Sequence, residues 1–127
     1  MALLKSTGSK KVNFDFNKEF INTFSDNIEL RNVDFINQTL KDLHESDIAN
    51  LIENLNPDTR NKLIEIESFN IEPEIFIELN ESIQSEVLQL LSIDSLIKII
   101  KRLESDDAIK ILENLSKENK EKVLEKL

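Results

Sequence analysis

The chain has 127 residues with a formal net charge of −9, and 39% of its residues are hydrophobic. This length fits a single domain with a real core, and the mixture of apolar and charged residues excludes a disordered tail and a membrane-spanning chain. The acidic surface repels nucleic acid, the lack of cysteine excludes disulfides and thiolate metal sites, and a single glycine argues against glycine-rich nucleotide loops.

The first thirteen residues are polar and predict a flexible N-terminal segment. From about residue 14 the pattern is helical, because four apolar residues recur on one helix face: Phe16, Phe20, Ile21 and Phe24. With Phe14 and Phe35, the phenylalanines could bind a partner, but we expect them to cover one end of the core. The sequence thus predicts a single α-helical domain over residues 14–127.

Leucines recur at intervals of twelve residues or twice twelve. They are Leu43, Leu55, Leu79, Leu91, Leu103, Leu115 and Leu127. The one vacancy falls on Glu67, next to Ile66 and near Phe69. An apolar pair precedes each of these positions after Leu43 by four and three residues, as Leu51-Ile52 precedes the leucine at 55. The pair and the leucine together are typical of one apolar stripe of a helix.

Short polar or acidic residues lie three positions after the leucine positions. They are Ser46, Asp58, Asn70, Ser82, Asp94, Asp106 and Glu118, with Asp34 one step earlier. Serine, aspartate and asparagine cap helix N-termini, so this column predicts a helix start in each repeat. Pro57 and Pro73 also suit helix starts, where a missing N–H costs little.

Helices of about eight residues are not stable alone and must stack on their neighbours. We therefore predict an all-α fold, a superhelical stack of short helices with a twelve-residue repeat. An ordinary helical bundle with an accidental periodicity is the alternative, and the number of agreeing columns argues against it. The pattern reaches Leu127 without a capping residue after it, which we interpret as a fragment of a longer chain.

Two segments of the repeat resemble a known family. Residues 43–58 contain a Leu-His-x-x-Asp-Ile-Ala segment followed by Leu-Ile-Glu-Asn-Leu, and residues 103–115 contain paired acids before a similar run. Over residues 26–127 the chain is similar to the amino-terminal cytosolic domain of bacterial MgtE-type magnesium transporters. One departure is Glu45, where the family has a proline.

The resemblance implies a regulatory function and not an enzyme. In that family the domain precedes CBS domains and a membrane-spanning pore, and the full-length protein works as a homodimer. The domain lies on the cytoplasmic face of the inner membrane and senses Mg²⁺. Magnesium held between acidic surfaces keeps the domains together and the pore closed. The alternative is a helical-repeat interaction scaffold similar to the amino-terminal domain of flagellar motor switch proteins, with no role for metal.

The resemblance also implies metal-binding residues. Asp106 and Asp107 match an acidic pair of the family, and Glu74 matches a further acid that faces bound Mg²⁺. An ordinary interpretation exists for each, because acids in a first helical turn suit the helix dipole. Lys110 stands where the family has another acid, and its ammonium group would oppose a cation. Since partner carboxylates would come from other domains, we expect weak Mg²⁺ binding by this chain alone.

His44 is the single histidine of the chain. One histidine does not make a zinc site, and no nucleophile motif accompanies it, so a catalytic role is not predicted. We expect it to pack or to form a hydrogen bond at a helix end.

Overall fold

The computed structural model describes residues 16–66 and 71–127, and every regular element in these two ranges is a helix. The helices are α1 (Lys18–Glu29), α2 (Val33–Lys41), α3 (Glu45–Asn54), α4 (Pro57–Glu65), α5 (Pro73–Phe76), α6 (Glu81–Leu88), α7 (Ile93–Arg102), α8 (Ser105–Asn114) and α9 (Lys117–Lys126). The predicted all-α fold class is confirmed. The predictions for residues 1–13, Phe14, Glu67, Phe69 and Asn70 lie outside the described residues.

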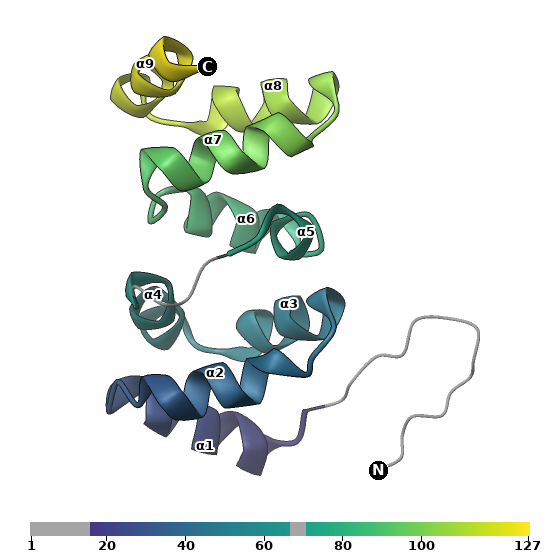
Figure 1. The fold of residues 1–127 in the computed structure, drawn as a ribbon, viewed down its shortest axis with the longest axis vertical. Helices are drawn as coiled ribbons and strands as arrows, with labels where there is room; N and C mark the ends of the chain where they lie inside the picture. The colour runs from purple at the N-terminus through teal and green to yellow at the C-terminus, as the bar shows by residue number, and fades with distance from the viewer. Residues whose placement is uncertain (1–15, 67–70) are drawn as a thin grey trace, which may run out of the picture.

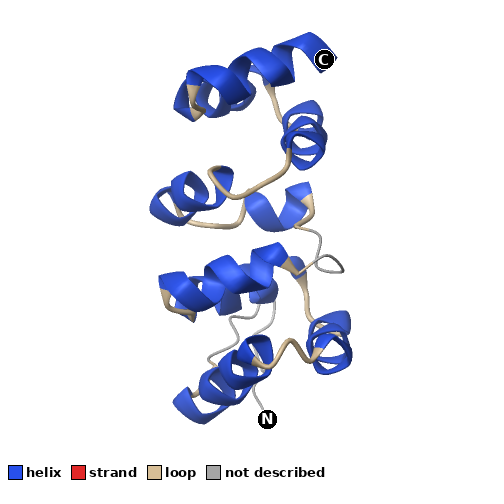
Figure 2. Cartoon of the chain, turned by 90° about the vertical axis from the view of Figure 1, so that its left-hand side faces the viewer, coloured by secondary structure: helices blue, strands red, loops and turns tan. Residues whose placement is uncertain are grey.

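The helices follow one another along the longest axis of the molecule, with α1 and α9 at opposite ends (Figure 1). Figure 2 shows the same succession of layers from the side. Contacts join α1 to α4, α3 to α5, α5 to α7, and α7 to α9. These helices are too short to persist alone in water, so their stability depends on contacts with the neighbouring layers. Within both described ranges, no helix has the length and apolar character needed to cross a bilayer.

The helix starts recur with regular spacing. The N-cap residues of α2, α3, α4, α6, α7, α8 and α9 are Asn32, His44, Asn56, Asn80, Ser92, Glu104 and Ser116. Consecutive caps are twelve residues apart, or twice twelve where residues 67–70 intervene. The caps of α1 and α5, Asn17 and Glu72, fall outside this spacing. Pro57 and Pro73 each occupy the first helical position, as expected.

The predicted capping column was wrong by two residues. Its members in the described ranges each occupy the second helical position: Asp34, Ser46, Asp58, Ser82, Asp94, Asp106 and Glu118. Apart from Asn32, the true caps have an extended backbone, and most accept a hydrogen bond from a backbone N–H, as Asn80 does from Ile83 at 2.9 Å. Both columns suit a helix start, one by capping and the other through the helix dipole, so the sequence alone did not separate them.

The repeated leucines lie between the helices and do not continue the helical stripe. Leu55, Leu103 and Leu115 are C-cap residues with an extended backbone, and each directly precedes the next N-cap. Their side chains nevertheless contribute to the core, where Leu55 and Leu115 are buried and Leu103 is partly buried. Leu127, at the end of the series, is 51% exposed. These buried and partly buried leucines therefore pack the short connections between helices against the core.

The buried side chains form one continuous cluster from Phe24 in α1 to Val123 in α9. Phe16, Phe20 and Phe24 stack on one another, with ring centroids 5.0 and 6.4 Å apart. Phe24 is buried, and Phe16, Phe20 and Phe35 pack partly buried against the core. The predicted role of these phenylalanines in covering one end of the core is confirmed for the described residues.

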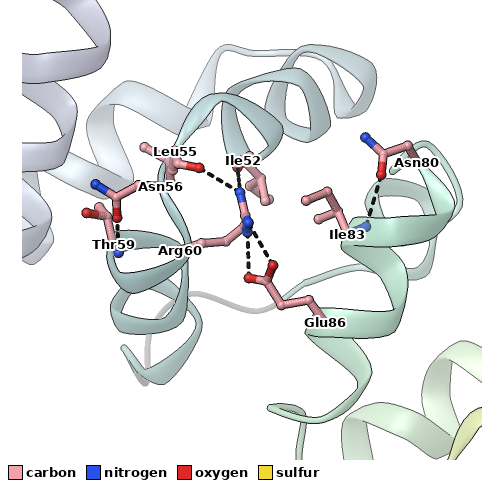
Figure 3. A network of polar contacts seen from close by, with 8 residues as sticks. All are labelled: Ile52, Leu55, Asn56, Thr59, Arg60, Asn80, Ile83 and Glu86. Carbon is pink, nitrogen blue, oxygen red and sulfur yellow. Dashed lines mark hydrogen bonds and ion pairs between the residues drawn. The ribbon is translucent and has the colours of Figure 1, made fainter.

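A buried arginine links helices on the two sides of residues 67–70 (Figure 3). Arg60 of α4 donates to both carboxylate oxygens of Glu86 of α6 at 2.7 Å. It also donates to the carbonyl oxygens of Ile52 and Leu55, at 3.2 and 2.6 Å, at the end of α3. Hydrogen bonding from Arg60, and then its charge, lowers the pKa of Glu86 below its ordinary value, against the effect of partial burial.

Candidate functional site

A groove of about 440 Å³ lies between the α5–α6 region and α8. Phe76, Leu88 and Ile111, which are all buried, form its apolar part. Three carboxylates and one ammonium group also line it: Glu81 from α6, and Asp107, Glu113 and Lys110 from α8. The groove is therefore acidic on balance and open to cations from solvent.

Glu74 lies in the single turn of α5, directly after Pro73. The proline at the first helical position fixes the start of this turn, and the acid after it suits the helix dipole. The Glu74 carboxylate is ion-paired with the guanidinium of Arg102, the last residue of α7. Their side chains are 37% and 60% exposed, so both remain accessible from solvent. The helix-to-helix contact between α5 and α7 brings these two residues together although 28 positions separate them.

Asp106 and Asp107 lie in the first turn of α8 and are exposed. Adjacent helical residues point about 100° apart, so the two carboxylates do not share one direction. Only Asp107 lines the groove, together with Lys110 nearly one turn later. Glu104 adds a third acid as the N-cap residue, without a side-chain capping hydrogen bond. The start of α8 therefore presents several carboxylates to solvent, with one of them directed to the groove wall.

The family model of the MgtE intracellular N domain matches residues 43–127. The chain belongs to this family. The match covers α3 to α9, including the groove and all three predicted metal-binding residues, and α1 and α2 precede it. No curated protein and no solved structure matches the chain.

The predicted resemblance to the MgtE amino-terminal domain is confirmed by this match. An MgtE N domain is a cytosolic part of a magnesium transporter, and this family is not one of enzymes. The predicted resemblance covers residues 26–127, whereas the family match begins at Leu43. The limits of the predicted domain, 14–127, stay a prediction.

The three predicted metal residues form no complete Mg²⁺ site among themselves. In the described ranges no group of three or more His, Cys, Asp or Glu residues is arranged to hold a metal ion. Magnesium commonly binds through one or two carboxylates and retains several waters, so accessible acids such as Glu74 or Asp107 fit a partial site. The remaining ligands would come from water or another domain. Glu74 can serve as a Mg²⁺ ligand only when its carboxylate is separated from the guanidinium of Arg102.

The structure adds features that the sequence did not reveal. The partner of Glu74 is Arg102, and no local pattern connects residues so far apart in the chain. Lys110, whose ammonium group is predicted to oppose a cation, lines the same groove as Asp107. His44 caps α3 and accepts a hydrogen bond from the Ser46 N–H at 3.2 Å, so its predicted role at a helix end is confirmed.

Proposed function

We propose that this MgtE N domain is the magnesium-responsive gating domain of a transporter. In this proposal, CBS and membrane-spanning domains follow in the same chain, and the transporter is a homodimer in the bacterial inner membrane with this domain on the cytoplasmic side. The family match over residues 43–127 carries the proposal, because these residues include the acidic groove and all three candidate ligands.

The mechanism rests on repulsion between acidic surfaces. The chain has a net charge of −9, and Glu74, Asp106 and Asp107 are all accessible to solvent. When Mg²⁺ is abundant, it neutralises these carboxylates and those of a neighbouring domain, so the two surfaces associate and the pore closes. When Mg²⁺ is scarce, the like charges repel and the closed arrangement loses its stabilisation, because only that arrangement binds the ion well.

The full-length transporter allows a direct test. We expect Glu74→Gln, or Asp106→Asn combined with Asp107→Asn, to raise the Mg²⁺ concentration that closes the pore by roughly fivefold or more, because a charged ligand is lost. The Mg²⁺ concentration that half-protects the cytosolic domains from protease and the concentration that half-inhibits Mg²⁺ uptake should shift by the same factor. Glu121→Gln is the matched control, because Glu121 is an exposed acid of α9 outside the groove lining.

If the Mg²⁺ concentrations at the midpoints of both measurements were unchanged in both variants, these residues would not be part of the sensor. Gating that did not depend on Mg²⁺ at all would overturn the proposal and favour the interaction scaffold.

A further inference from the structure

One candidate metal ligand, Glu74, is already ion-paired with a positively charged side chain of the same domain. The guanidinium of Arg102 is ion-paired with the carboxylate of Glu74, which it reaches from the last turn of α7. This pair is internal to the domain and joins α5 to α7. Lys101 precedes Arg102 in the same helical turn, is also exposed, and forms no ion pair among the described residues.

The position of the pair allows exchange with solvent ions. Arg102 is 60% exposed at a helix end, where the backbone leaves the helix at Leu103, so its side chain has room to swing away. Glu74 is 37% exposed and would then be free to accept another cation. For an exposed ion pair, the paired arrangement is favoured over the separated one by only about 1.4- to fivefold, so both arrangements are well populated.

We propose that Arg102 is a tethered counter-ion that competes with divalent cations for Glu74 and thereby sets the concentration at which the domain responds. Its guanidinium occupies the carboxylate when divalent cations are scarce and is displaced when they are abundant. The apparent affinity of the carboxylate for a divalent ion is its intrinsic affinity multiplied by the fraction of time that Arg102 is separated from it. This inference rests on the proposed function, since it takes Glu74 as a cation ligand.

The test uses the 127-residue chain and Mn²⁺, whose unpaired electrons broaden nearby amide signals in nitrogen-15 NMR spectra. We expect Arg102→Gln to lower by two- to fivefold the Mn²⁺ concentration that half-broadens the signals around residue 74. Lys101→Gln removes the same charge from the same turn without touching Glu74. At 0.15 M salt we expect it to change the midpoint by less than about 1.5-fold, since screening weakens its more distant charge.

One further variant and one further measurement separate competition from a structural role. Arg102→Lys keeps the charge but loses the planar donor pair, so its midpoint should lie between wild type and Arg102→Gln. Thermal unfolding of Arg102→Gln without metal should be nearly unchanged, because an exposed pair contributes little to stability. Equal shifts for Arg102→Gln and Lys101→Gln would overturn the inference, since they would reflect net charge alone.

The same titration distinguishes failure of this inference from failure of the proposed function. If Glu74→Gln abolishes the broadening and Arg102→Gln leaves the midpoint unchanged, Glu74 is a ligand and Arg102 is not its competitor. If the broadening around residue 74 persists in Glu74→Gln, the ion binds elsewhere, and both the inference and the assignment of Glu74 to the sensor fail.

Discussion

At the scale of single residues, the buried ion pair of Arg60 and Glu86 involves no residue that lines the acidic groove. The Arg60 side chain is 5% exposed and the Glu86 side chain 31% exposed, so water screens their attraction only partly. The guanidinium donates two hydrogen bonds to Glu86 and two to carbonyl oxygens, which together satisfy a charge that would be costly to bury alone. This pair is therefore a stability element, in contrast to the exposed pair of Glu74 and Arg102.

We expect Glu86→Gln to lower the free energy of unfolding at pH 7 by about 1–3 kcal/mol, because it leaves the buried guanidinium without a counter-charge. The folded-state pKa of Glu86 is lowered from an ordinary value of 4.5, so its contribution is present above that pH and is lost as the pH falls through the folded-state pKa. Urea unfolding at pH 7, 5 and 3 should therefore show a difference from wild type that is constant at first and then shrinks.

Glu121→Gln serves as the control for this measurement, since it removes the same charge from an exposed position of α9. Its effect should stay within about 0.5 kcal/mol at every pH. A difference for Glu86→Gln that grew as the pH fell would contradict the assigned direction of the pKa change.

At the scale of elements, the capping residues decide where each short helix begins. Asn80 caps α6, and we expect Asn80→Ala to cost about 0.5–2 kcal/mol because the Ile83 N–H loses its acceptor. Ser82, which the sequence had suggested as the cap, occupies the second helical position, so Ser82→Ala should change stability by less than about 0.5 kcal/mol. Thermal or urea unfolding of the two variants measures both values. A larger loss of stability in Ser82→Ala than in Asn80→Ala would instead identify Ser82 as the capping residue.

The sequence predicted the helical class and the spacing between helix starts because both follow from local patterns of apolar and polar residues. It misplaced the caps by two residues, since Asn80 and Ser82 are both suitable near a helix start. It did not predict the partner of Glu74 or the burial of Arg60. Those facts depend on how α5 meets α7 and how α4 meets α6, which no twelve-residue window contains.

At the scale of the whole molecule, the net charge is −9 and no complete metal site is formed in the described residues. We therefore expect the isolated chain to bind Mg²⁺ with a dissociation constant of 1 mM or weaker. At 1 mM Mg²⁺ the linked stabilisation is then at most about 0.4 kcal/mol. Calorimetric titration and thermal unfolding, compared with NaCl at equal ionic strength, check this expectation. Tight stoichiometric binding would contradict a site shared between domains.

The succession of contacts from α1 to α4, α3 to α5, α5 to α7 and α7 to α9 also has a mechanical consequence. Layers whose main contacts are with near neighbours respond like springs in series, so a load applied at α9 is passed from layer to layer before it reaches α1. In such an arrangement the most compliant interface sets the stiffness of the whole. The buried pair of Arg60 and Glu86 adds a link between α4 and α6 to this succession, whereas the α5–α7 interface carries the exposed pair of Glu74 and Arg102, which stiffens it less.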